Sequence, residues 1–165
     1  MDRPNIKKVK QLLTEAPIGE YLGEYGIDIF SACAGVEIAL NDNELLFQED
    51  DTDNSFYIVK GGRLACFEKS AKDKREHILH VFERGDLIGE MSFIDGTAHA
   101  CSVKALGEAS VICFKEADIK KLITSEPEVM YDFMKAIITR AHHTLNDILR
   151  QQRALSSYIS GNIYR

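Results

Sequence analysis

The fold and the candidate site of this 165-residue chain both depend on residues 85–103, which read GDLIGEMSFIDGTAHACSV. Gly89 follows an apolar pair, Leu87 and Ile88, and precedes Glu90. Glycine lets a backbone approach a ligand closely, and a short helical turn beginning just after it would offer free amides to an anion. Glu90 would repel a bare phosphate, but its carboxylate can accept hydrogen bonds from sugar hydroxyls. The residues therefore favour a ligand that carries a phosphate and a ribose close together.

In its order and spacing, this stretch resembles the phosphate-binding cassette of cyclic-nucleotide-binding domains, the family of the catabolite activator protein and the protein kinase A regulatory subunits. The family pattern runs Gly-Glu, a small apolar stretch, a turn, then Arg, two small residues, Ser/Thr and Val. The matching residues are Gly89, Glu90, Ala100, Ser102 and Val103. The resemblance implies a ligand site formed by Gly89, Glu90, Met91, Ser92, His99, Ala100, Cys101 and Thr144. We call residues 89–103 the cassette.

The cassette departs from the family pattern at His99, which stands where the family has the arginine that grips the cyclic phosphate. Losing a charge-assisted pair costs about 1.5–3 kcal/mol, or one to two decades in affinity. Ala100 also lacks the hydroxyl that cGMP-selective members offer to guanine. We therefore expect weak, cAMP-leaning binding that tightens as the pH falls toward the ordinary histidine pKa of about 6.5. The alternative is that His99 is an exposed turn histidine in a pocket that has lost its ligand.

Short strands separated by polar turns fill residues 36–114 and predict an all-β barrel or roll. The expected strands are 36–40, 45–47, 56–59, 63–68, 78–82, 101–105 and 110–114. The run 44–62 also resembles the family, although Asn43 stands where a glycine is common and Asp50-Asp51 replaces the usual Gly-Asp. With the resemblance, the fold class is mainly β with flanking helices, a jelly-roll-like or cupin-like double-stranded β-helix. The acidic loop 48–54 contains four carboxylates that could suggest a metal site, but it lacks the glycine and terminal glutamate of a calcium loop and is expected to be a solvated turn away from the phosphate.

Helical patterns flank the strands on both sides. Apolar spacing predicts a helix over 4–15 and a second over about 20–34, with Gly23 and Gly26 as candidate breaks. A short helix is expected over 116–123, and a capping box at Ser125 begins a long helix that runs to about residue 155. The resulting division is a helical segment 1–34, a β-roll 35–115, C-terminal lid and dimerisation helices 116–155, and a tail 156–165.

The long helix carries a heptad seam, which predicts a homodimer through residues 126–155. The seam residues are Tyr131, Met134, Ile138, Ala141, Leu145, Ile148, Gln152 and Leu155. A stripe that packs only on the chain's own roll is the alternative. The resemblance places this helix over the nucleotide, with Thr144 in the position that contacts adenine and Arg140 on the same helix. Leu145 replaces a serine that reaches the partner's nucleotide, so that contact is expected to be lost.

Composition excludes several other classes of function. A formal net charge of −6 argues against a nucleic-acid surface, and no apolar run reaches membrane-spanning length. The four cysteines, Cys33, Cys66, Cys101 and Cys113, form no CxxC pair and are expected to be reduced thiols in a cytoplasmic protein. The histidine pairs His77/His80 and His142/His143 suit a shared metal badly. No catalytic constellation or cofactor is predicted.

Two hypotheses about function remain. The first is a cAMP-leaning sensor that binds a cyclic nucleotide and acts through an effector protein, because no DNA-binding or other effector domain is recognised in the sequence. The second is a ligand-free, dimeric protein-interaction domain on the same fold, with a pocket made degenerate by His99. An enzyme or a metal sensor is disfavoured by the composition and the spacing of the polar residues.

Overall fold

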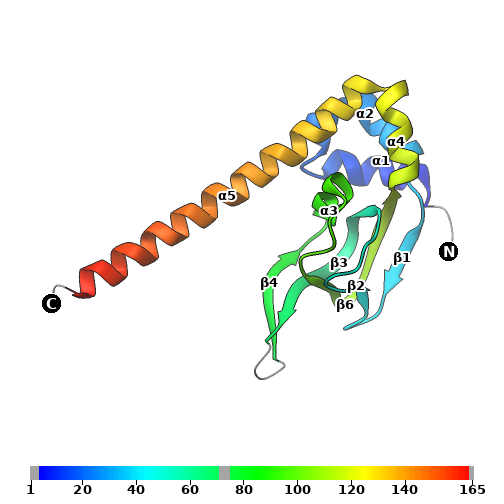
Figure 1. Cartoon of the computed structure of the whole chain (residues 1–165). Helices are drawn as coiled ribbons and strands as arrows, with labels where there is room; N and C mark the ends of the chain where they lie inside the picture. Colours follow the sequence, from blue (N-terminus) through cyan, green and yellow to red (C-terminus); the bar gives the residue numbers. More distant parts are fainter. Residues whose placement is uncertain (1–3, 71–74, 164–165) are drawn as a thin grey trace.

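The computed structural model describes residues 4–70 and 75–163. In Figure 1, two short helices and a helical C-terminal arm flank a roll of β-strands. The elements are α1 Ile6–Glu15, α2 Gly19–Ala32, β1 Glu37–Leu40, β2 Leu45–Phe47, β3 Ser55–Lys69, β4 Glu76–Phe82, β5 Leu87–Ile88, α3 Glu90–Asp95, β6 Ser102–Lys115, α4 Glu116–Ser125 and α5 Pro127–Ile163. The predicted fold class, a β-roll between N-terminal helices and a long C-terminal helix, is confirmed.

Two long strands, β3 and β6, form the frame of the roll. They pair antiparallel from Ser55↔Lys115 to Phe67↔Ser102, and β1 and β2 add to β6 while β4 and β5 add to β3. The sequence suggested two separate strands in each of these places. The register instead shifts at Gly61, and both strands bend there without ending. Gly62 allows the bend, because its φ is 72° and a Cβ would lie 2.2 Å from the Glu108 carbonyl oxygen.

Alternation along β3 divides the apolar residues between two cores. Tyr57 and Val59 face the interior of the roll, whereas Phe56 and Ile58 face the helices. The helix-facing core contains a stacked pair, Phe56 and Phe114, with ring centroids 4.9 Å apart. The strand pattern therefore both closes the roll and provides the surface on which the helices pack.

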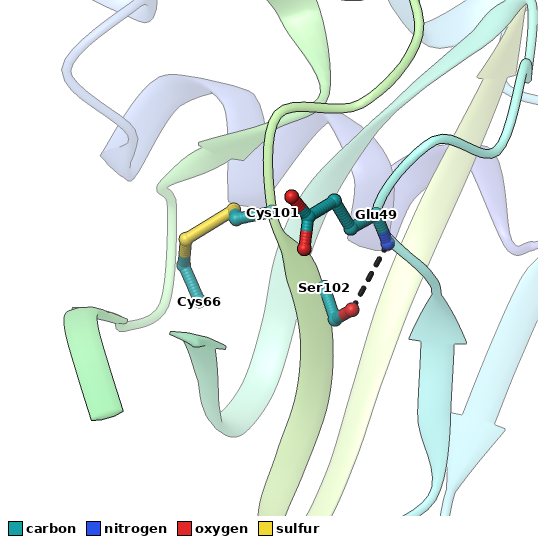
Figure 2. The surroundings of a disulfide bond; sticks show 4 residues. All are labelled: Glu49, Cys66, Cys101 and Ser102. Atoms are coloured by element: carbon teal, nitrogen blue, oxygen red, sulfur yellow. Dashed lines mark hydrogen bonds between the residues drawn. A yellow bond between two sulfur atoms is a disulfide. The ribbon is translucent and has the colours of Figure 1, made fainter. Parts of the chain in front are cut away.

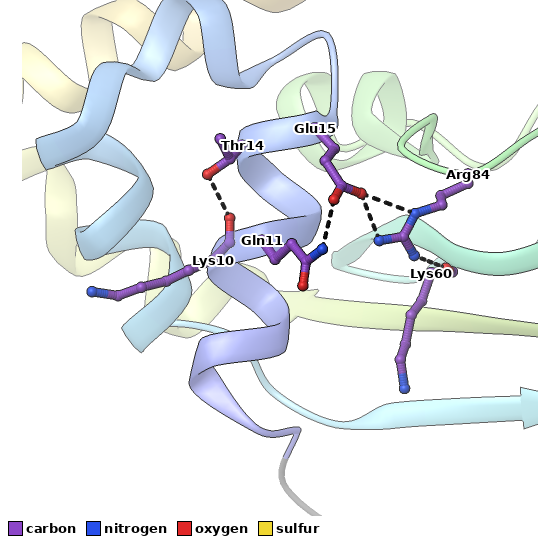
Figure 3. Close-up of polar contacts among 6 residues, drawn as sticks. All are labelled: Lys10, Gln11, Thr14, Glu15, Lys60 and Arg84. Carbon is purple, nitrogen blue, oxygen red and sulfur yellow. Dashed lines mark hydrogen bonds and ion pairs between the residues drawn. The ribbon is translucent and has the colours of Figure 1, made fainter.

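The N-terminal helices cap one end of the roll. Asn5, which follows Pro4, is the N-cap of α1: its side chain accepts a hydrogen bond from Lys7 N at 3.0 Å. Figure 3 shows the Arg84 guanidinium between the Glu15 carboxylate, at 2.8 Å, and the Lys60 carbonyl. In α2 the predicted break occurs at Gly23, where φ and ψ are 63° and 179°.

The two ends of α5 have different surroundings. Its first turns bury Val129, Phe133 and Ile137 against the roll, and then the helix leaves the roll as an arm (Figure 1). The predicted end near residue 155 is wrong, because α5 continues to Ile163 through the segment expected to be a tail. No proline follows Pro127 to stop it. Within the described ranges, none of the helices has the length and apolarity that crossing a membrane requires.

Candidate functional site

Gly89 joins β5 to α3 in the conformation that the cassette pattern requires. Its φ is 79°, in the left-handed region, and its carbonyl accepts the first turn's hydrogen bond from Phe93 N at 3.1 Å. A Cβ at this position would lie 3.2 Å from Cε1 of His99. Glycine is therefore favoured here both by the backbone and by the close approach of the imidazole.

Glu90 is half-buried at the start of α3. Burial raises the pKa of its carboxyl group, and the nearby charge of Arg140 opposes that shift. Arg140 extends from α5 and donates from Nη2 to the Leu87 carbonyl at 3.2 Å. The structure therefore places a half-buried carboxylate within electrostatic range of a guanidinium, which is an arrangement suited to a polar ligand.

His99 occupies neither of the two environments that the sequence suggested. Only 3% of it is exposed, and its ring stacks on Phe47 with centroids 3.7 Å apart and 10° between the planes. Burial lowers the pKa of the imidazole, with Asp53 and Asp51 opposing. Among the described residues, nothing forms a hydrogen bond with its Nε2 atom. The exposed-turn hypothesis is therefore wrong, and contact with a phosphate would require the ring to turn outward.

The acidic loop lies against the cassette, although the sequence analysis expected it away from the phosphate. Two backbone hydrogen bonds join His99 to the loop, each at 3.0 Å. The His99 N–H donates to the Asp51 carbonyl, and the Asp50 N–H donates to the His99 carbonyl. Asp50 keeps a φ of 67° where the family has glycine. The loop connects β2, whose Phe47 pairs with Val103 at the end of the cassette, to β3.

Cys66 and Cys101 form a disulfide, and the expectation of four reduced thiols is therefore wrong for this pair. Cys66 lies on β3 opposite Val103 of β6, two residues beyond Cys101. The two cysteines are 35 residues apart, so no local motif signals the pairing. Cys33 and Cys113 are free. The expectation of a cytoplasmic location rested partly on reduced thiols and loses that support.

The other predicted site residues are more dispersed. Met91 and Ala100 are exposed and Ser92 is half-buried, all within the cassette. Thr144 is exposed on α5 and donates from its hydroxyl to the Arg140 carbonyl at 3.2 Å. Thr144 and Arg140 line a cavity of about 300 Å³ with Tyr21 and Leu87, and no cassette residue lines it. The structure therefore brings the cassette residues together and places Thr144 in a neighbouring cavity.

Three contributors to the site were not among the predicted ligand residues. They are Phe47, which stacks on His99, Asp53, which accepts a hydrogen bond from the Tyr57 hydroxyl, and Arg140. Arg140 carried a sequence signal, since it lies one helical turn before Thr144. Phe47 matches the family's pattern, but its stacking on His99 carried no signal because the two residues are distant in sequence. Asp53 carried none, although its partner Tyr57 is only four residues away. Within residues 4–70 and 75–163, no three histidine, cysteine or acidic side chains are grouped to hold a metal ion.

Comparison with known proteins agrees with this architecture. Residues 37–126 match the cyclic nucleotide-binding domain family, and the chain belongs to that family. The solved N-terminal domain of a transcriptional regulator from Streptomyces coelicolor superposes with a TM-score of 0.70 at 26% identity, covering 81% of this chain and 94% of that one. The cAMP-bound regulatory domain of Toxoplasma gondii protein kinase A has a TM-score of 0.69 at 17% identity, over 84% of this chain and 50% of that one, which shows the shared fold.

The curated relatives are much longer than this chain. A lysophospholipase of Cryptococcus neoformans is 29% identical over 108 residues, which is 66% of this chain and 6% of that protein. A cAMP-activated global transcriptional regulator of Mycobacterium tuberculosis is 22% identical over 103 residues, which is 62% of this chain and 46% of that protein. The chain thus matches only a part of each of these proteins.

Proposed function

We propose that this domain is a regulatory sensor that binds a cyclic nucleotide weakly at the cassette and leans toward cAMP. The observation that carries the proposal is Gly89 in its left-handed conformation, presenting the sheltered Glu90 carboxylate at the start of α3. A ribose hydroxyl is the natural partner for such a carboxylate, and the adjacent amides suit a phosphate. Ala100, which is exposed and has no hydroxyl, supports the preference for cAMP over cGMP.

His99 limits the affinity of the proposed site. In its buried position the imidazole contributes no charge to the ligand, and its low pKa keeps it neutral at physiological pH. Asp51 and Asp53 lie near enough to influence that pKa and would also repel an anion. Binding therefore relies on the backbone amides, on Glu90 and on any hydrogen bond that His99 donates after its ring turns outward. These contributions support a low affinity for the nucleotide.

Calorimetric titration with cAMP and cGMP, in dithiothreitol, tests the proposal. Glu90→Gln removes the charge but keeps the shape, and it should weaken cAMP binding about tenfold because a charge-assisted hydrogen bond becomes a neutral one. Glu24→Gln, an exposed carboxylate on α2, is the matched control and should bind like the wild type. No heat and no thermal shift with millimolar nucleotide, or equal affinity in both variants, would reject the site.

A second candidate function is a ligand-free interaction domain, and the buried position of His99 favours it. A ring stacked on Phe47 fills space in the roll and needs no ligand. This candidate predicts that the domain works only through its surfaces, above all α5. The titration separates the two candidates, because a decayed site would give no response to any cyclic nucleotide while the fold and the helical arm remained intact.

For either candidate, we propose that the output passes through α5 to a second copy of the chain and an effector protein. Along its length, α5 exposes Tyr131, Ile138 and Leu145, with exposed fractions of 68%, 64% and 54%. Their spacing of seven residues is that of a coiled-coil seam. Arg140 connects the same helix to the strand that precedes the cassette. A change at the cassette would therefore reach the arm through a short path.

A further inference from the structure

We propose that the Cys66–Cys101 disulfide is a reversible thiol switch that holds the cassette in its inward arrangement, and that reduction releases the cassette for an anionic ligand. The inference deepens the proposed function and rests on it for the identity of the ligand. Its structural part, a change in the mobility of the cassette with the redox state, can be measured without any nucleotide.

Cys101 lies in the segment that joins α3 to β6. The segment between α3 and β6 is attached to the roll by backbone hydrogen bonds between His99 and the acidic loop and by the bond from Glu49 N to the Ser102 hydroxyl at 2.9 Å. The disulfide is a covalent attachment in the same segment. Figure 2 shows Cys101 directed to Cys66 on one side of the chain and Ser102 directed to Glu49 on the other. The segment is thus fixed on both sides.

The disulfide also restricts His99, which lies two residues before Cys101. Two residues span at most about 7 Å of extended chain, so an anchored Cys101 restricts how far the backbone at position 99 can move. With the bond intact, the imidazole stays on Phe47, its Nε2 atom lacks a partner among the described residues, and it is unavailable to a ligand. Reduction leaves only non-covalent attachments, which can open and close.

A small dithiol can reduce the Cys66–Cys101 bond by thiol–disulfide exchange. A dithiol thiolate attacks Sγ of Cys101, the more exposed partner, because Cys66 is only 8% exposed. The S–S bond breaks, Cys66 leaves as a thiolate and takes up a proton, and a mixed disulfide forms at Cys101. The second thiol of the reductant then closes its own disulfide and releases Cys101 as a thiol. In total the protein gains two electrons and two protons, and the dithiol loses them.

His80 lies on β4, directly opposite Cys66. It pairs with Cys66 across β3 and β4, and directly opposed residues of an antiparallel pair project from the same face. β4 is exposed at this position, so the strand beside Cys66 borders solvent.

The test compares oxidised protein with protein reduced by dithiothreitol, and alkylation followed by mass measurement establishes the redox state. Reduction should increase amide hydrogen exchange over residues 96–102 and tighten cAMP binding at least about fivefold, the lower end of typical coupling between sites. Cys101→Ser and Cys66→Ser should behave like the reduced protein under both conditions. Cys33→Ser, which removes a free half-buried thiol, should keep the full response.

The outcomes distinguish this inference from the proposed function. Faster exchange over residues 96–102 on reduction, with no cyclic nucleotide bound in either state, would support the switch and reject the nucleotide site. Equal exchange and equal cAMP affinity in both states would reject the switch and leave the nucleotide site standing. The absence of a Cys66–Cys101 bond after oxidation would also overturn the inference.

Discussion

His99 shows how a single substitution changes a site. The family's arginine would have to stay at the surface because its charge is permanent, whereas an imidazole can lose its proton and enter the roll. Here it does so, stacking on Phe47 under Gly89. The identity of the residue was visible in the sequence. Its inward direction was not, since that depends on the space left between β2 and the cassette.

The pH dependence of stability follows from this burial. The folded-state pKa of His99 is lowered, so below about pH 6.5 the unfolded chain binds a proton that the folded chain does not. Its contribution to stability is therefore full above that pH and is lost as the pH falls toward the folded-state pKa. His99→Phe keeps the stack and should lose less stability than the wild type between pH 7.5 and 5.5 in urea titrations. His80→Phe, at an exposed histidine, should retain the wild-type dependence; equal slopes for all three proteins would contradict the argument.

Restoring the family's arginine gives a second prediction at this scale. His99→Arg cannot keep the buried position, so the side chain should turn toward the ligand and supply a fixed charge. We expect cAMP affinity to rise about ten- to hundredfold, the value of a charge-assisted pair. His80→Arg adds the same charge on exposed β4 and is the control. A calorimetric titration in which both variants match the wild type would show that position 99 does not face the phosphate.

At the scale of the elements, the roll depends on the shared bend of β3 and β6. Gly62 and Gly107 both have positive φ, at 72° and 78°, but a Cβ would lie 2.2 Å from a carbonyl oxygen at Gly62 and meets nothing within 4 Å at Gly107. Gly107→Ala should therefore cost about 1 kcal/mol for its conformation alone. Gly62→Ala should cost about 2–4 kcal/mol, because a strand must also shift. Chemical denaturation measures both, and equal losses would contradict this account of the bend.

The sequence predicted most elements but not their continuity. Strand patterns located β1, β2, β3, β4 and β6, and Gly-Glu located the start of α3, whereas the two-residue strand β5 was not predicted. The sequence divided β3 and β6 because a glycine pair or a Leu-Gly-Glu run resembles a turn, and only pairing with a bent partner shows that the strand continues. The disulfide and the contact of the acidic loop with the cassette depend on pairing between distant segments. Local patterns carry no information about such pairings.

At the scale of the whole molecule, the arm of α5 determines how the domain meets other chains. Leu145→Glu places a charge on the exposed seam and should shift the proposed dimer to monomer in light scattering at micromolar concentration. Ala154→Glu adds the same charge to an exposed position on the outer side of the helix and should leave the dimer intact. A monomer in the wild type, or equal dissociation in both variants, would contradict a seam at this position. The side chain of Leu155, the last predicted seam residue, lies outside the described residues.

The proposed binding site for a cyclic nucleotide is the cassette, and not the cavity beside Thr144. Amide chemical shifts of isotope-labelled, reduced protein during titration with cAMP distinguish the two sites, because each residue reports separately. We predict saturable shifts at residues 89–92 and 99–101, with a weaker apparent affinity in Glu90→Gln. Shifts confined to the surroundings of Tyr21, Arg140 and Thr144, or no shifts at millimolar cAMP, would contradict this placement.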